Sequence, residues 1–359
     1  MFFMNKKRSI GLGIDIGTKV IKAVEISKKN KQFFLENYGE IDLDFACEYF
    51  FRSFNKKDFN PDVENISKAL SELLKEAKFK SNFVVFSLPD FSTFFATFEM
   101  PPMSKKEIDS AIYFEARKYI PLPLSDIVLD WQSMENKISE KDINNVLVMA
   151  VSKNTINNYQ KIAENIGLKL SAVEPEAISL KRSFDISSDE NVCLVEIGFQ
   201  STNISLIKNG CMVMSFSFDL AGKNLTEKIV EALEVETSIA EKLKRKYGLT
   251  NFENFSGFDI LEPIVSEISE KIGRVISEFE KKEKIVVPKI IFSGGTSLMS
   301  GFLDYLNDKI NSNRHNKIIL ELGRPFDRIN YPKELEERMV DINANYAIAL
   351  GEALKNFDK

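Results

Sequence analysis

The sequence Ile-Gly-Leu-Gly-Ile-Asp-Ile-Gly-Thr-Lys-Val-Ile-Lys-Ala-Val-Glu, from Ile10 to Glu25, predicts two short strands joined by a tight turn. Apolar residues alternate with glycine and aspartate as far as Ile16, which is the period of a strand. The turn is Asp15-Ile-Gly-Thr-Lys19, and a second apolar run begins at Val20. The chain therefore opens with a β-hairpin whose turn is polar.

The turn residues have the chemistry of a phosphate site. Gly17 has no side chain, so backbone amides can approach an anion closely. Thr18 adds a hydroxyl donor and Lys19 a cation, while Asp15 is placed to hold a hydrated Mg²⁺ beside the phosphate. An ordinary hairpin, in which Asp15 and Gly17 serve only the turn, fits the same residues.

The same pattern returns roughly 180 residues later. The apolar strand Val192-Cys-Leu-Val-Glu-Ile-Gly198 ends in an acid and a glycine, and a return strand follows from Ser201 to Ile207. Asn209-Gly210 then forms a hairpin turn. Two such hairpins, each at the start of one half of the chain, indicate an internal duplication.

Composition narrows the class of protein. The chain has 359 residues, enough for two domains, and a net charge of −5, which disfavours a nonspecific nucleic-acid binder. His315 is its one histidine and is expected in a polar loop, which disfavours a Ser-His-Asp triad, a Cys-His pair and a His-rich zinc site. Cys47, Cys193 and Cys211 are widely spaced, as expected of reduced thiols in a cytosolic protein.

The sequence contains no apolar run of about 20 residues that would cross a bilayer. The apolar residues at 1–4 precede the basic residues at 6–8, which is the wrong order for a signal peptide. We therefore expect a cytoplasmic protein with no direct membrane insertion, which reaches a membrane only through a partner.

The remaining periodicities predict the domain plan. Residues 1–89 and 171–186 are expected to form a first domain, and residues 90–170 an α+β insert with the order strand, helix, strand, strand, helix. Ser104-Lys-Lys-Glu107 is a capping box for the first helix of the insert. Residues 187–343 are expected to form a second domain, with 223–286 as its small helical subdomain, and residues 344–359 a small-residue helix that packs back on the first domain.

Three motifs in chain order, and two further ones between them, resemble the actin-like ATPase superfamily, whose fold is a ribonuclease-H-like α/β unit present twice. Asp15–Lys19 resembles the first phosphate loop, and Glu196–Thr202 the second. Phe292-Ser-Gly-Gly-Thr-Ser297 resembles the adenosine loop, and Val173–Ala177 the start of the first connecting helix. Glu241-x-x-Lys244 resembles the helix pair that contacts ribose and adenine. The expected fold is therefore a two-domain actin-like α/β fold with a small α+β insert in the first domain.

Within this superfamily, the insert resembles that of the PilM family of type IV pilus assembly. The similar segments are Met100-Pro-Pro-Met103, Tyr119–Leu124, Ile127–Trp131 and the late run Tyr346-Ala-Ile-Ala-Leu-Gly351. FtsA shares the general plan but has a linker and an amphipathic membrane helix after the core. The sequence stops eight residues past Gly351, which argues for PilM over FtsA.

The resemblance implies that the two halves bind Mg-ATP in a cleft. Asp15 and Glu196 would orient the metal through its waters, and Glu174 would position the attacking water, so that Glu174 and Glu196 are the catalytic candidates. Gly294, Gly295 and Thr296 would receive the adenosine, Glu241 and Lys244 the sugar or base, and Gly222 would close the far side. The phosphates would be surrounded by Gly17, Thr18, Lys19, Gly198, Gln200, Ser201 and Thr202.

The second hairpin departs from the superfamily pattern. Glu196 stands where an aspartate is usual, and Phe199 where a further glycine is usual. We therefore predict nucleotide binding with at most slow hydrolysis. At this stage Glu196 also fits a solvated acid at a strand end, and Glu241 with Lys244 also fits an exposed ion pair on a helix.

The phenylalanines at the start of the insert lie on both faces of one strand. Phe94 and Phe98 share one face and Phe91 and Phe95 the other, and a small insert cannot easily bury both faces. The resemblance implies a groove between the first domain and the insert, which binds the short cytoplasmic N-terminal peptide of a PilN-like inner-membrane protein.

The leading hypothesis is an ATP-binding scaffold of a type IV pilus platform, or of a related type II secretion or competence system. Pilus motor ATPases and further copies of the chain are additional candidate partners. An FtsA-like polymer that assembles on the membrane is the second hypothesis. A small-molecule kinase is the third, although no motif for its general base or second substrate pocket stands out in the sequence.

Overall fold

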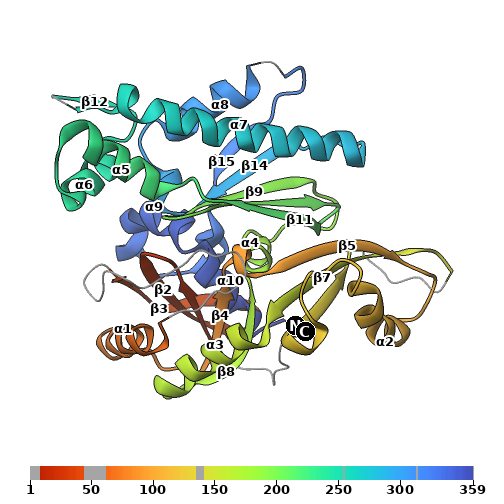
Figure 1. Ribbon diagram of the computed structural model, residues 1–359. Coiled ribbons are helices and arrows are strands. Elements are labelled where there is room, and N and C mark those ends of the chain that lie inside the picture. Colours follow the sequence, from red (N-terminus) through yellow and green to blue (C-terminus); the bar gives the residue numbers. More distant parts are fainter. Residues whose placement is uncertain (1–8, 44–61, 135–140, 254, 313, 359) are drawn as a thin grey trace.

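The computed structural model describes residues 9–43, 62–134, 141–253, 255–312 and 314–358. Cys47, Pro61 and most of the Phe-rich stretch before Pro61 lie outside the described residues. The described chain forms two α/β domains and a small insert (Figure 1). The predicted fold class is confirmed.

The first domain is built on a six-stranded sheet in the order β16-β3-β2-β1-β4-β8. Apolar side chains of the inner strands face the helices α1 (Val63–Glu76) and α3 (Lys153–Asn165), where Leu12, Phe86 and Tyr159 are fully buried. The other face packs against α10 (Ala347–Lys355). The strands are β1 (Ile10–Ile16), β2 (Val20–Lys29), β3 (Gln32–Asp42), β4 (Phe83–Leu88), β8 (Lys169–Pro175) and β16 (Ile329–Asn330).

The glycines that alternate along β1 allow α10 to lie directly on the strand. A Cβ on Gly11 would come within 2.3 Å of the Ala353 carbonyl oxygen, and a Cβ on Gly13 within 2.2 Å of that of Ala349. No other residue fits at this separation. In Figure 1, α10 and α4 (Glu176–Ser183) lie between the two main sheets.

The second domain repeats the opening hairpin in a five-stranded sheet ordered β11-β10-β9-β14-β15. Its strands are β9 (Val192–Ile197), β10 (Thr202–Lys208), β11 (Cys211–Phe218), β14 (Lys289–Ser293) and β15 (Ile319–Leu322). The helices are α5 (Gly222–Leu233), α6 (Thr237–Tyr247), α7 (Gly257–Glu283) and α8 (Phe302–Asn311), with the short pair β12 (Asn251–Phe252) and β13 (Phe255–Ser256) before α7. The Gly294-Gly295 pair leads into the short 3-10 turn η4 (Gly295–Leu298), and α8 begins only at Phe302.

The insert is smaller than predicted. Its sheet is β5-β7-β6, covered by α2 (Lys105–Ala116), and the predicted capping box is present, with the Ser104 amide donating to Glu107 at 2.7 Å. However, α3 does not belong to it, because Ile156, Tyr159 and Ile162 are buried in the first-domain core. The insert therefore ends near residue 152 and not at residue 170. Its strands are β5 (Phe94–Met100), β6 (Ile127–Ser133) and β7 (Asn144–Ser152), and the 3-10 turns η2 (Asp90–Ser92) and η3 (Leu124–Asp126) precede β5 and β6.

The second face of the insert sheet is covered by the second domain. Phe95 packs with Ala177 and with Met212 of β11, and Phe98 is buried among the residues under α2. Phe91 and Phe94 are partly buried. The predicted difficulty of burying both faces is thus resolved by contact between domains, and none of these four rings is an exposed surface.

The return to the first domain also begins earlier than the predicted boundary at residue 344. Phe326 and Met339 are buried in the same cluster as Val24 and Leu350. This segment contains η5 (Pro325–Arg328), β16, η6 (Lys333–Leu335) and α9 (Glu336–Asn345) before α10. Among the described residues, no helix combines the length and the apolar character that crossing a bilayer requires.

Candidate nucleotide-binding site

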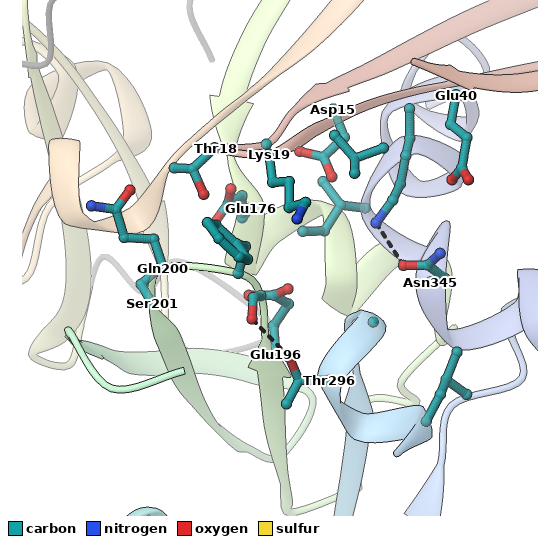
Figure 2. A pocket seen from close by; sticks show the side chains of 18 of the residues that line it. Asp15, Thr18, Lys19, Glu40, Glu176, Glu196, Gln200, Ser201, Thr296 and Asn345 are labelled. Atoms are coloured by element: carbon teal, nitrogen blue, oxygen red, sulfur yellow. Dashed lines mark hydrogen bonds between the residues drawn. The ribbon is translucent and has the colours of Figure 1, made fainter. Parts of the chain in front are cut away.

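A cavity of about 460 Å³ lies between the two domains, a size suited to a small-molecule ligand. The turns of both hairpins, α6, η4 and α9 line it, and Figure 2 shows Asp15, Lys19, Glu176 and Glu196 around one space. Twelve of the predicted site residues line the cavity: Asp15, Gly17, Thr18, Lys19, Glu196, Gly198, Gln200, Ser201, Glu241, Lys244, Gly295 and Thr296.

In the first hairpin, Asp15 ends β1 and accepts a hydrogen bond from the Ser87 hydroxyl at 2.8 Å. Burial raises the pKa of Asp15, whereas the charge of Lys22 and the bond from Ser87 lower it. Lys22 is the cross-strand partner of Asp15, and its ammonium group donates to Asn345 Oδ1 at 2.6 Å. Lys22 was not among the predicted site residues, although the symmetric spacing around the turn pairs it with Asp15.

In the second hairpin, Glu196 pairs across the strands with Asn203. The Asn203 amide donates to Glu196 at 3.3 Å and to Glu176 at 2.9 Å. Burial, followed by the charge of Asp15, raises the pKa of Glu196 to about 8. Glu196 is only 9% exposed, so the alternative of a solvated acid at a strand end is wrong.

The structure places Glu176, and not Glu174, at the cavity. Glu174 is buried beside Arg182 and lies 3.6 Å from Lys355. Burial favours a higher pKa for Glu174, but the charges of Arg182 and Lys355 outweigh it and the pKa is lowered. Glu176 lines the cavity, and burial together with the charges of Asp15 and Glu196 raises its pKa well above the usual range. The predicted position of Glu174 in the cleft is therefore corrected.

The acid–lysine pair on α6 is also part of the buried site. The Lys244 ammonium group, 4% exposed, donates to Glu241 at 2.7 Å, to Thr226 at 2.8 Å and to the Gly222 carbonyl at 3.0 Å. Burial acts to raise the pKa of Glu241, but Lys244 and the hydrogen bonds it receives lower it to about 2. The alternative of an exposed helix ion pair is wrong for Lys244.

Three predicted residues, Gly294, Gly222 and Thr202, lie next to the residues that line the cavity and hold them in place. Gly294 has a φ of 86°, and a Cβ there would lie 2.4 Å from the Ile197 carbonyl oxygen. A Cβ on Gly222 would lie 2.6 Å from Thr296 Oγ1, which donates to the Gly198 carbonyl at 2.9 Å. Thr202 donates its hydroxyl to Leu220 at 2.7 Å. These close approaches fix the second loop against η4.

The lining suits an anionic ligand with a divalent cation. Thr18, Ser201, Lys19 and Lys22 supply donors, and the turn glycines leave the backbone accessible. In the parts of the chain that the structure describes, no three acidic, histidine or cysteine side chains converge to hold a metal ion directly. Asp15 and Glu196 place carboxylate oxygens in the lining, and such oxygens can accept hydrogen bonds from the water ligands of a magnesium ion, which is the arrangement that the resemblance implies.

The fold is that of the actin-like ATPases. It is similar to EutJ from Carboxydothermus hydrogenoformans, with a TM-score of 0.56 and 12% identity over 98% of this chain and 92% of that one. It is also similar to a non-polymerising MamK mutant bound to AMPPNP, with a TM-score of 0.50 and 12% identity over 98% and 100% of the two chains.

Within that class, the model of the type IV pilus assembly protein PilM family matches residues 13–357, and the chain belongs to this family. The solved PilM-PilN type IV pilus biogenesis complex is similar with a TM-score of 0.84 and 22% identity, over 99% of this chain and 100% of that one. The recognition made from the sequence is confirmed.

Curated relatives include cell division protein FtsA of Neisseria meningitidis, 22% identical over 268 residues, which are 64% of each chain. FtsA of Bacillus subtilis is 26% identical over 163 residues, which are 42% of this chain and 37% of that protein. The chain thus spans between about a third and two thirds of the length of these relatives.

Proposed function

We propose that this protein is a nucleotide-binding scaffold of type IV pilus assembly. It binds Mg-ATP between its domains and acts in the cytoplasm, held at the inner membrane by a PilN-like partner. The observation that carries the nucleotide proposal is the cavity, where two equivalent hairpins present Asp15 and Glu196 to one space. The solved MamK mutant bound to AMPPNP, which has a similar fold, supports it.

In this proposal, Lys22 joins the predicted phosphate-binding residues of the first hairpin. Glu176 takes the place of Glu174 as the residue that faces the attacking water. Burial and the charges of Asp15 and Glu196 raise the pKa of Glu176, which disfavours the carboxylate form that a general base requires. This supports at most slow hydrolysis. A bound magnesium ion would supply charge neutralisation of the phosphates, with Asp15 and Glu196 orienting its water ligands.

Calorimetric titration of the purified protein with Mg-ATP tests this site. Asp15→Ala should weaken binding at least tenfold, or about 1.4 kcal/mol. Asp304→Ala, an exposed acid on α8, is the matched control and should leave the affinity unchanged. If the wild-type protein does not bind, the hairpins serve only the architecture and the nucleotide proposal fails.

The partner proposal rests on family membership and on the PilM-PilN complex. The partner segment is the short cytoplasmic N-terminal peptide of a PilN-like protein, and the groove between the first domain and the insert is its expected site. A fluorescently labelled peptide of this kind should bind with an anisotropy change, and a scrambled peptide should not. Equal binding of both peptides would contradict the proposal. Pilus motor ATPases and further copies of the chain are additional proposed partners.

A polymer is the second candidate function, because the fold is also similar to that of the MamK double helical filament, with a TM-score of 0.52. This candidate predicts filaments after addition of Mg-ATP. Sedimentation and negative-stain microscopy at increasing protein concentration distinguish the two functions. A scaffold stays in the supernatant with and without nucleotide, whereas a polymer pellets only with nucleotide.

A further inference from the structure

Phe199 occupies an equivalent place to Thr18 in the duplicated hairpins. Each directly follows the turn glycine, Gly17 or Gly198, and lies three residues after the acid at the strand end. The registers agree, since Asp15 pairs with Lys22 and Glu196 with Asn203, seven residues on in both cases (22 − 15 and 203 − 196). One hairpin thus places a hydroxyl, and the other an aromatic ring, at the same point of the turn.

The ring of Phe199 lies between two cations that come from different domains. The Lys19 ammonium nitrogen is 4.7 Å from the ring centroid, and that of Lys244 is 5.9 Å away. Both lysines are less than a tenth exposed. Cation–π contacts are stronger when water is excluded from them. The ring therefore occupies the space between the first phosphate loop and α6.

The backbone around Phe199 is held in place by several hydrogen bonds. The Lys223 amide donates to the Phe199 carbonyl at 2.6 Å, and the Gly222 amide to the Gly198 carbonyl at 3.1 Å. The Gly198 amide donates to the Ser201 carbonyl at 3.0 Å, which closes the turn. A ligand that needs the space of the ring has to rotate the side chain, since these bonds oppose a shift of the loop.

We propose that Phe199 limits the length of the phosphate chain, so that the cavity binds a nucleoside diphosphate more tightly than the triphosphate. The inference rests on the proposed nucleotide site. A terminal phosphate would meet a ring that donates no hydrogen bond and that already contacts Lys19.

The test is calorimetric titration with ADP and ATP, each with excess Mg²⁺, on the wild-type protein and on Phe199→Thr. That variant copies the residue of the first hairpin. We expect the wild-type protein to bind ADP at least tenfold more tightly than ATP. In Phe199→Thr the ratio should fall below threefold because ATP affinity rises.

Leu298→Ala is the matched control, since Leu298 lines the same cavity from η4. It should change both affinities by the same factor and leave the ratio at the wild-type value. Phe199→Leu keeps an apolar side chain but removes the aromatic face, so the ratio of ADP affinity to ATP affinity should fall less than it does in Phe199→Thr. A thermal melt without ligand shows whether Phe199→Thr folds. If it does not, Phe199→Leu provides the test instead.

The outcomes separate the two proposals. If the wild-type protein binds neither nucleotide, the proposed function itself fails. If it binds ADP and ATP equally, or if both Phe199 variants keep the wild-type ratio, the role of Phe199 is overturned while the nucleotide site stands.

Discussion

The two hairpins that face the cavity share their backbone but differ in charge. In the first, the strand-end acid Asp15 has the cation Lys22 as its cross-strand partner. In the second, Glu196 has the neutral amide of Asn203 in the same position. Burial raises the pKa of both acids, and only the first has a cation directly opposite. The two copies of the hairpin thus keep the same turn geometry, while the positive charge that an anionic ligand needs is concentrated in the first copy.

The strands that lead into the hairpins differ as well. Gly11 and Gly13 of β1 correspond to Val192 and Leu194 of β9, displaced by the same interval as the two acids (196 − 15). The backbone of α10 packs directly on the two glycines. In the second copy, the side chains of Val192 and Leu194 pack against Ala347 and Ile348 near the start of this helix. One helix thus contacts both copies, closely in the first and through side chains in the second.

The largest expected effect comes from a substitution that tests the close packing of α10 on the glycines of β1. Gly13→Ala places a methyl group on the α10 backbone and should lower the free energy of unfolding by about 3 kcal/mol, measured in urea. Gly273→Ala is the matched control, because no atom lies within 4 Å of a Cβ there. It should be neutral or stabilise α7 by up to about 1 kcal/mol. Equal stabilities for the two variants would contradict the close packing of α10 on β1.

The charge difference between the hairpins should appear in ligand affinity. Lys22→Met removes the cross-strand cation, and the affinity for Mg-nucleotide should fall about 30-fold, or about 2 kcal/mol. Asn203→Ala, the equivalent position in the second hairpin, should cost less than about fivefold. Calorimetry on both variants measures the contrast. Similar losses would mean that the cation of the first hairpin has no special role.

The smallest expected effect concerns Asp90, which adds negative charge on the side of the second hairpin. Its carboxylate accepts from the Ser215 hydroxyl at 2.6 Å and from the Ala177 amide at 3.2 Å. Burial raises the pKa of Asp90 to about 6. The group therefore contributes its full stability below about pH 4, and this contribution is lost as pH rises through 6.

Asp90→Asn cannot ionise, so it should be more stable than the wild-type protein by about 1 kcal/mol at pH 7.5. The advantage should shrink when the pH falls to 5. Urea unfolding at both pH values measures it, with Asp304→Asn on α8 as the exposed control. A difference between wild type and Asp90→Asn that does not change with pH would show that Asp90 does not titrate in this range.

Much of the fold and of the site was predictable because its signals are local. The acid–glycine turn of each hairpin, the strand alternation before it and the Gly294-Gly295 pair all lie within a few residues of sequence. Lys22 was predictable in principle, because a tight turn pairs residues at equal distances from its centre.

The rest depends on tertiary contacts that no local pattern contains. Two acids flank Pro175, and only the transition from β8 to α4 decides that Glu176 faces the cavity while Glu174 meets Arg182. The apolar stripe of α3 predicts a helix but not the sheet on which it packs. The partial burial of Phe95 likewise depends on a strand of the other domain, β11.

The position of α10 has a consequence for synthesis on the ribosome. β1 is made among the first residues of the described chain, but the helix that covers its glycine face is residues 347–355. During translation this face of the first sheet stays open until nearly all of the described chain has emerged. The second domain has its own buried cluster, formed by residues 193–318, and can fold earlier. The first domain to be made is therefore the last to be completed.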